Sequence, residues 1–317
     1  MRRRDFAVTA GAALAACSRS RKKLVAVIAK GRSHIFWLTV QAGAMAAGEE
    51  FGLDIEWNAP AQETEYARQI QIVESMIAKR VDGLVLAATD RKALVGPVDR
   101  ATSSGIPVTI FDSGLDSTNY MSYVATDNVE AGRMGARALA KLLGGKGKAA
   151  VIQHVPGSVS TMDREQGFEE VIARDFPQIR IVQKLYGMSD RAKSMAAAEN
   201  ILTAHPDLDG FFASTEPSST GTVLALKGRG VNGKVKLVAF DSNETMIEDV
   251  RQGNIHAMVV QDPFKIGYEA VKTIAIKLQG GQPPKRMDLA AVVVSRDNLD
   301  TPEMKKLLNP DVKKYLR

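Results

Sequence analysis

The chain has 317 residues, of which 45% are hydrophobic and 25% are charged, a composition typical of globular proteins. Its net charge of +6 comes from the amino-terminal end, because residues 1–23 hold seven basic side chains and one acidic side chain. The rest of the chain carries 35 basic and 35 acidic side chains, so it has no net positive field that would attract a nucleic acid.

The first residues have the pattern of an export signal. Three arginines precede an apolar run from Phe6 to Ala16, which is too short to span a bilayer as a helix. The small residues before Cys17 resemble a bacterial lipobox, in which the new amino-terminal cysteine carries lipid, and Arg3-Arg4-Asp5-Phe6 resembles a twin-arginine signal. We expect residues 1–23 to be a signal and tether, with lipidation at Cys17 anchoring the protein outside the cytoplasm, in the periplasm. A buried structural Cys17 and general secretory export are the alternatives.

Beyond residue 23, short apolar runs rich in β-branched residues alternate with longer segments of helical period. In the segment 62–79, for example, Ile70, Val73 and Met76 recur at spacings of three. This alternation predicts an α/β fold with doubly wound parallel sheets. Two sheets in tandem are favoured over one continuous sheet, with the irregular stretch 112–119 as a crossover between lobes. The predicted strands are 24–29, 53–57, 83–87, 107–111, 121–125, 148–153, 179–185, 210–213, 235–240 and 255–260.

Polar side chains follow nearly every predicted strand. Ligands of doubly wound sheets bind beyond the carboxyl ends of the strands, so these residues are candidates for a site. Some of them, such as Asp127, would also cap helices, but capping does not explain the aromatic pair Phe36 and Trp37 near His34. Carboxylates, amides, an arginine and flat aromatic rings together predict a site for a polar, uncharged sugar. The candidates are His34, Phe36, Trp37, Asp112, Asp127, Arg164, Thr215, Glu216, Asp241 and Gln261.

The sequence predicts no cofactor and no metal. The glycine pattern at 228–233 follows a predicted helix, whereas dinucleotide binding needs it to follow a strand, and the four histidines lack metal-ligand spacing. Asp112, Glu216 and Asp241 could supply the acid and base of a glycosidase, which is the enzyme alternative. Hydroxyl binding explains these carboxylates without catalysis, so we expect a binding protein.

Eight short strings occur in register across the chain: His34-Ile35-Phe36-Trp37, Val81-Asp82-Gly83-Leu84, Gly105-Ile106-Pro107-Val108, Ala125-Thr126-Asp127-Asn128, Arg164-Glu165-Gln166-Gly167-Phe168, His205-Pro206-Asp207-Leu208, Phe240-Asp241 and Gln261-Asp262-Pro263-Phe264. With these strings the chain resembles the periplasmic sugar-binding proteins of bacterial ABC transporters, of the ribose- and galactose-binding type. The resemblance implies two Rossmann-like lobes joined by three hinge segments, a sugar enclosed between them, and docking of the closed form on a membrane permease. It implies a first lobe of 24–126 and 262–287 and a second lobe of 127–261 and 288–317.

The resemblance also implies roles for the candidate residues. Phe36 and Trp37 would stack on the sugar, while Asp112, Arg164, Asp241 and Gln261 would bind its hydroxyl groups. His34 and Thr215 stand where ribose binders carry asparagine, and Glu216 lies beside Thr215. Ser113 and Ala87 replace an arginine and an asparagine of ribose binders, which favours another pentose, a hexose or a sugar alcohol.

The expected partners are one sugar or polyol per monomer and the permease subunits of an ABC transporter, without nucleic acid. A sensory role, in which the loaded protein acts on a chemoreceptor or sensor kinase, is an alternative. A repressor core of the lactose-repressor type would share the two-lobed fold, but it would carry a DNA-binding helix-turn-helix where this chain has an export signal.

Overall fold

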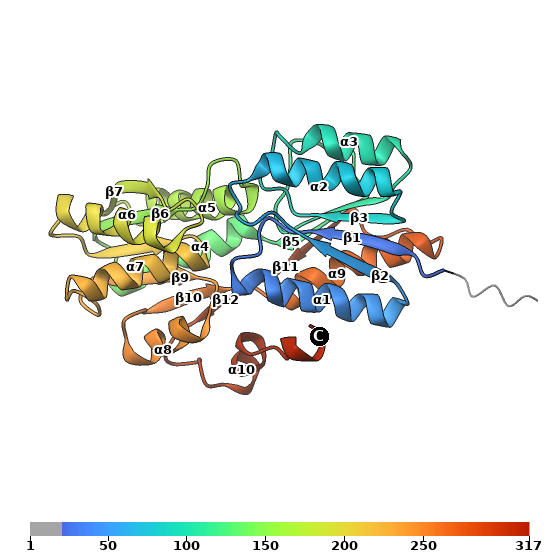
Figure 1. The fold of residues 1–317 in the computed structure, drawn as a ribbon. Helices are drawn as coiled ribbons and strands as arrows, with labels where there is room; N and C mark the ends of the chain where they lie inside the picture. Colours follow the sequence, from blue (N-terminus) through green and yellow to red (C-terminus); the bar gives the residue numbers. More distant parts are fainter. Residues whose placement is uncertain (1–20, 317) are drawn as a thin grey trace, which may run out of the picture.

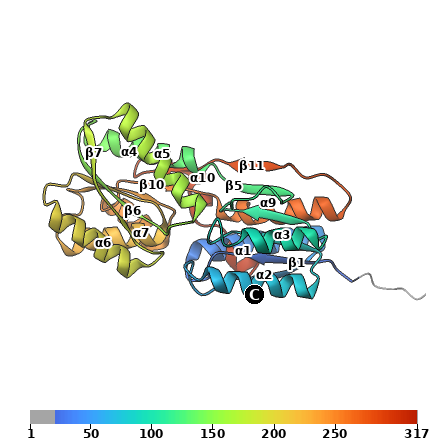
Figure 2. The same cartoon turned by 90° about the horizontal axis from the view of Figure 1, so that it is seen from above.

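The computed structural model describes residues 21–316, which form two α/β lobes lying end to end (Figure 1). Each lobe contains one six-stranded sheet with helices on both faces, as the view from above also shows (Figure 2). Residues 1–20, which include the predicted signal and Cys17, lie outside the described part of the chain.

The sheet of the first lobe is parallel throughout, in the order β11-β5-β4-β3-β1-β2. Hydrophobic residues of α1 (Ile35–Phe51) and α9 (Pro263–Leu278) cover one face of it. Those of α2 (Tyr66–Lys79) and α3 (Val95–Ser103) cover the other. The strands are β1 (Leu24–Ile28), β2 (Asp54–Asn58), β3 (Gly83–Leu86), β4 (Val108–Phe111), β5 (Ser122–Thr126) and β11 (Arg286–Leu289).

The sheet of the second lobe has the order β12-β10-β9-β8-β6-β7, in which β12 alone pairs antiparallel. Its strands are β6 (Gly147–Gln153), β7 (Ile179–Tyr186), β8 (Gly210–Ala213), β9 (Lys236–Phe240), β10 (Ala257–Val260) and β12 (Val292–Val294). Helices α4 (Asn128–Leu143) and α5 (Val159–Asp175) cover one face. The other face is covered by α6 (Arg191–Ala204), α7 (Glu216–Gly228), α8 (Glu244–Gln252) and α10 (Pro302–Leu308).

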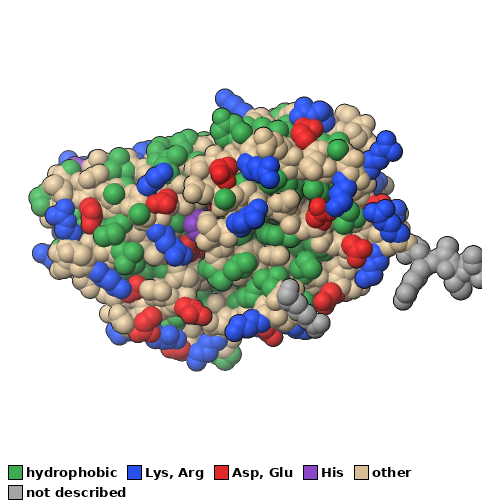
Figure 3. Space-filling view, viewed as in Figure 1, with side chains coloured by type: hydrophobic (Ala, Val, Ile, Leu, Met, Phe, Trp, Pro, Cys, Tyr) green, Lys and Arg blue, Asp and Glu red, His purple; other side chains and the backbone are tan. Residues whose placement is uncertain are grey.

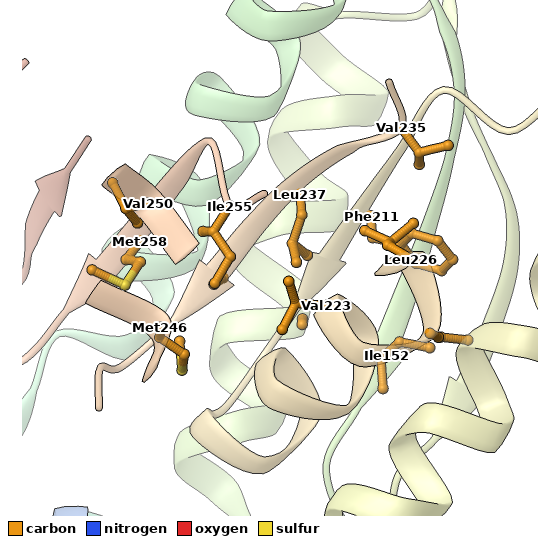
Figure 4. Packing of buried hydrophobic residues seen from close by; sticks show 14 of the residues in the cluster. Ile152, Phe211, Val223, Leu226, Val235, Leu237, Met246, Val250, Ile255 and Met258 are labelled. Carbon is orange, nitrogen blue, oxygen red and sulfur yellow. The ribbon is translucent and has the colours of Figure 1, made fainter. Parts of the chain in front are cut away.

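The strands are buried on both faces, which explains why they appear in the sequence as continuous apolar runs. In the second lobe, Phe211, Leu237 and Met258 of neighbouring strands meet Val223 of α7 and Met246 of α8 in one cluster (Figure 4). Their neighbours in the strands, such as Phe212 and Val238, point to the opposite face and pack under α4 and α5.

The chain crosses between the lobes three times, and two of these crossings exchange helices. Helix α4 follows β5 of the first sheet but packs on α5 of the second lobe, and α9 follows β10 of the second sheet but packs on α1 of the first lobe. The third crossing joins β11 to β12 at Ala290-Ala291. Each lobe therefore receives one of its helices from a strand of the other lobe.

The structure confirms the ten predicted strands to within two residues at each end, and it confirms two parallel sheets rather than one. The predicted crossover at 112–119 is wrong, because this stretch joins β4 to β5 within the first sheet. The third crossing lies a few residues later than predicted, since residues 286–289 pair with β5. Strands β11 and β12 were not predicted.

The assignment of all residues from 288 to the second lobe is also corrected. Helix α10 belongs there, because Met304 lies in the second lobe's core. The 3-10 turn η1 (Val312–Lys314) packs on α1 instead, and the Tyr315 ring lies 5.6 Å from that of Phe264 at the start of α9. The end of the chain therefore returns to the first lobe.

Glycines bring the exchanged helices into close contact with their partners. A Cβ atom on Gly132 of α4 would lie 2.0 Å from the Arg164 carbonyl oxygen, and one on Gly167 of α5 would lie 2.1 Å from that of Val129. The same arrangement joins α1 and α9, where a Cβ on Gly267 would lie 2.0 Å from the Val40 oxygen. Backbone atoms cannot rotate out of the way as side chains do, so any larger residue at these positions would push the paired helices apart.

We expect Gly132→Ala to lower the free energy of unfolding by about 1–3 kcal/mol, because the added methyl group forces α4 and α5 apart. Urea unfolding followed by circular dichroism measures the effect. Gly228→Ala is the matched control, since a Cβ there would meet no atom within 4 Å, and it should leave stability unchanged or slightly raised. Equal stability of the Gly132 variant and the unmodified protein would contradict this account of the helix contact.

Candidate functional site

The carboxyl ends of both sheets face each other across a small cavity between the lobes. In this arrangement of the lobes the cavity is narrow, with a volume of about 30 Å³, which is room for no more than a few water molecules. Nine of the ten predicted site residues line it, together with residues that were not predicted. Its walls are Lys30, His34, Phe36, Trp37, Glu63, Asp112, His154, Thr161, Arg164, Thr215, Glu216, Pro217, Asp241 and Gln261.

Phe36 and Trp37 form the aromatic wall, at the first turn of α1. Their rings meet edge to face with centroids 5.0 Å apart, and Trp37 also meets Phe111 of β4 edge to face at 6.3 Å. Trp37 is 2% exposed and belongs to the core of the first lobe, while its indole N–H donates to Glu63 Oε1 at 2.9 Å. Trp37 is therefore both a core residue and part of the cavity wall, and Phe36 is the more accessible ring.

A cluster of buried charges joins the two lobes at one side of the cavity. Lys30 Nζ, just after β1, lies 3.2 Å from Asp112 Oδ2 and 3.7 Å from Glu63 Oε2, and it also donates to Ser158 and Ser160 of the second lobe at 3.2 Å. His154, at the end of β6 in the second lobe, lies with Nε2 3.0 Å from Glu63 Oε2. These contacts hold the lobes together, so the structure represents a closed form.

The charges of this cluster set the ionisation of its members. Burial by itself would raise the pKa of Glu63, but Lys30 and His154 outweigh it and hold the pKa of this carboxyl far below its usual range. For His154, burial is the largest influence and lowers the pKa, although Glu63 acts in the opposite direction. Glu63 is thus a permanent anion of the closed form.

The opposite wall is formed by Arg164, Asp241 and Gln261. The Arg164 guanidinium lies over the Phe240 ring at 3.9 Å and is oriented by hydrogen bonds from Nε to Asn128 Oδ1 at 2.8 Å and from Nη1 to the Ser214 carbonyl oxygen at 3.1 Å. Gln261 Nε2 donates to Asp241 Oδ1 at 2.8 Å. Burial raises the pKa of Asp241, against the opposing effect of Arg164, whose Nη1 lies 4.0 Å away.

Asp112 and Asp241 share an uncommon backbone conformation. Each follows a strand near the middle of its sheet, β4 or β9, and each has a positive φ, 55° for Asp112 and 62° for Asp241. Aspartate and asparagine enter this left-handed region more readily than other side chains do. Both carboxylates are thereby directed into the cavity rather than along their strands.

Glu216 and His34 complete the site at the second interlobe contact. Glu216, the first residue of α7, accepts a hydrogen bond at Oε1 from Arg191 at 2.6 Å, and its Oε2 lies 3.5 Å from Nδ1 of His34 in the first lobe. His34 Nε2 is 3.1 Å from Ser189 Oγ. Thr215 caps α7 together with Ser218, and its hydroxyl lies 3.3 Å from His154 Nδ1.

Buried polar atoms without a hydrogen-bond partner concentrate at this cavity. The described part of the chain has five such side-chain atoms, and three belong to cavity residues: His34 Nδ1, Asp112 Oδ2 and Glu216 Oε2. Asp112 Oδ2 lies 3.2 Å from Lys30 Nζ, and Glu216 Oε2 lies 3.5 Å from His34 Nδ1, but neither contact is a hydrogen bond. The three atoms therefore mark where a polar ligand would supply the missing hydrogen bonds.

One predicted site residue is not brought to the cavity. Asp127 is exposed and caps α4, accepting a hydrogen bond from the backbone N–H of Glu130 at 3.0 Å. Its neighbour Asn128 is buried and acts through Arg164. The prediction of Asp127 as a ligand residue is wrong because the capping role, noted as an alternative, determines its position.

Lys30, Glu63 and His154 were not among the predicted site residues. His154 directly follows β6 and Lys30 is the second residue after β1, so the strand-end rule that found Asp112 could also have found them. Glu63 lies in the loop between β2 and α2, five residues beyond the strand, and no sequence signal distinguishes it there. Within residues 21–316 no cluster of side chains suited to a metal ion is present, and no helix there is long and apolar enough to cross a membrane.

Comparison with known proteins agrees with this geometry. A family model described as the periplasmic binding protein domain matches residues 25–282. The D-ribose/D-allose-binding protein of Pseudomonas aeruginosa is 31% identical over 272 residues, covering 83% of this chain and 84% of its own. The D-allose-binding periplasmic protein of Escherichia coli is 28% identical, covering 81% of this chain and 85% of its own.

Solved structures show the same fold. A solute-binding protein of an ABC transporter from Agrobacterium vitis with bound D-fucose is 36% identical and superposes with a TM-score of 0.87 over 90% of this chain and all of that one. A carbohydrate-transporter solute-binding protein from Agrobacterium radiobacter in complex with D-arabinose gives a TM-score of 0.89 at 29% identity, over 92% of this chain and all of that one. From its two-lobed fold and the extent of the family match, this chain is a member of the periplasmic binding protein family.

Proposed function

We propose that this protein binds one monosaccharide or sugar alcohol between its two lobes and delivers it to the permease of an ABC transporter. The observation that carries the proposal is the set of three buried atoms of His34, Asp112 and Glu216 that make no hydrogen bond in the cavity between the lobes. Hydroxyl groups of a sugar both donate and accept, so they would satisfy all three. The sugars bound by the relatives support the same class of ligand.

The walls of the cavity agree with a small, polar, uncharged ligand, for which the lobes would have to move slightly apart. Its charged groups already pair with one another, as Lys30 does with Asp112 and Glu63. An anionic ligand would face four carboxylates, those of Glu63, Asp112, Glu216 and Asp241. The partly buried Phe36 ring offers an apolar surface for the C–H face of a sugar.

Closure of the lobes gives a mechanism for delivery. A ligand that contacts both walls shifts the protein toward the closed form by the difference between its affinities for the two forms. A permease that recognises the closed form would then receive only loaded protein. The proposal includes a monomer with one sugar site, no catalysis, and no nucleic acid partner. The anchoring of the protein through a lipid on Cys17 stays a prediction from the sequence, because that residue lies outside the described part.

A thermal-shift screen of residues 18–317 against pentoses, hexoses and sugar alcohols tests the proposal. A ligand at about 100 times its Kd should stabilise the protein by about 2.7 kcal/mol and raise its Tm. Recovery of the sugar unchanged after incubation would support a binding protein. A sugar consumed during incubation would favour a glycosidase that uses the cavity carboxylates, and no shift with any sugar would contradict the proposal.

Asp112→Asn should weaken binding of the sugar found in the screen by about 1.5–3 kcal/mol, because a charged acceptor is replaced by a neutral amide. Asparagine tolerates the positive φ at this position, so the ligand-free protein should keep its fold. Asp127→Asn is the matched control, since asparagine caps a helix as well as aspartate does. Isothermal titration calorimetry measures both variants, and equal affinities would remove Asp112 from the site.

Binding should weaken as the pH falls below about 6.5, the ordinary pKa of histidine. In the closed form burial lowers the pKa of His154, and Lys30 and Arg164 act in the same direction, against Glu63. Opening separates His154 from Glu63 and returns it to water, so the open form binds the proton more tightly and acid favours opening. The contribution to closure is therefore complete above this pKa and is lost as the pH falls.

Titrations of the sugar between about pH 7.5 and pH 5.5 measure this dependence. His154→Gln keeps a side chain that can donate to Glu63 but does not titrate, so its affinity should change less over this interval. The comparison separates the effect of His154 from that of Asp241. The pKa of Asp241 is raised in the closed form, so protonation of Asp241 favours closure as the pH falls. The same slope in both proteins would show that His154 is not the titrating group.

A further inference from the structure

The carboxyl-terminal segment connects the two lobes a fourth time. Up to Leu308 it belongs to the second lobe, where Met304 is 6% exposed in the core and Leu307 and Leu308 pack against the same cluster. An exposed ion pair from Arg251 of α8 to Asp300 at 3.2 Å also joins the approach to α10 to this lobe. This part of the segment is firmly attached to one lobe.

Beyond Asn309 the chain lies on the other lobe. The turn η1 packs on α1, and the Tyr315 ring packs on Phe264 at the start of α9. Both partners are elements of the first lobe. In Figure 1 this passage is seen as the red end of the chain running from α10 to a position below α1.

Between these two attachments the segment runs over the hinge. A hollow beneath it is lined by Val260, Gln261 and Asp262 of the second crossing, by Leu289 and Ala290 of the third crossing, and by Asn309, Pro310 and Tyr315 of the segment. A second hollow lies between the segment and the exposed side chains of Ile35 and Leu38 on α1. Hydrophobic side chains gather over α1 on this face (Figure 3).

We propose that residues 310–316 act as a strap across the hinge that favours the closed arrangement of the lobes. The segment is attached to both lobes, and it covers the crossings about which the lobes rotate. An opening rotation moves α1 and α9 relative to α10, so the strap has to leave the first lobe or be deformed. Its contacts on α1 and Phe264 therefore contribute to the free-energy difference between open and closed forms.

Two residues that line the ligand cavity also line the hollow beside the strap. Phe36 and Gln261 line both the cavity and the hollow next to the segment. Gln261 in turn orients Asp241 and accepts a hydrogen bond from Thr126 at 2.7 Å. The strap is thus placed to influence both the hinge and the cavity wall without contacting the ligand.

The test compares the protein with a variant that ends at Asn309. Small-angle X-ray scattering without ligand should show a larger radius of gyration for the shortened chain, although it has fewer residues. This readout requires no knowledge of the ligand, so its result is independent of the proposed sugar binding. With a sugar found in the screen, the shortened chain should bind roughly 2- to 10-fold more weakly and release the sugar faster.

Tyr315→Ala tests the same contact if the shortened chain fails to fold, and it should shift both measurements in the same direction by a smaller amount. Tyr315→Phe is its matched control, because it keeps the ring that packs on Phe264. Circular dichroism and the Tm report whether the fold is retained. Unchanged scattering and unchanged affinity in the folded Tyr315→Ala variant or the folded shortened chain would overturn the proposal.

Discussion

The closed form is governed by the cost of removing charge from water. Lys30, Glu63 and Asp112 of the first lobe are buried ions, His154 of the second lobe hydrogen-bonds Glu63, and a buried ion without a partner is strongly destabilising. Each of them is paired, yet the pairing leaves Asp112 Oδ2 without a hydrogen bond, as it leaves Glu216 Oε2 and His34 Nδ1 at the second contact. The pairing of charges lets the cleft close, but three of its polar atoms are left without hydrogen bonds. A ligand with several hydroxyl groups can supply these bonds and thereby stabilise the closed form.

The polar side chains of the cavity come from equivalent positions in two similar lobes. Asp112 follows the central strand β4 and Asp241 follows β9, which has the same place in the second sheet, and both have a positive φ. Arg164 is held near the cavity because Gly132 lets α4 lie directly against α5. The side chains that would contact the ligand are therefore fixed by strand ends and helix contacts, and the rotation of the lobes brings the two sets together.

Most of the fold could be predicted from the sequence, because strands buried on both faces leave unbroken apolar runs such as those of β1 and β8. The edge strands β11 and β12 could not, since β11 is polar and largely exposed and β12 has only three residues. At the site, residues directly after strands were predictable, whereas Glu63 depends on how its loop folds over Trp37. Asp127 was misplaced because a capping aspartate and a ligand-binding aspartate follow a strand in the same way, and only the tertiary structure separates them.

The exchange of helices between the lobes has a consequence for how the chain folds during synthesis. The first sheet begins with residue 24 but lacks β11, and its α1 lacks α9, until residues 263–289 have been made. By then all strands of the second sheet except β12 have already been made. The first lobe therefore cannot complete its core ahead of the second, as an ordinary amino-terminal domain does. The two lobes become complete almost together, within the last tenth of the chain, and neither corresponds to a continuous fragment that could be expressed alone.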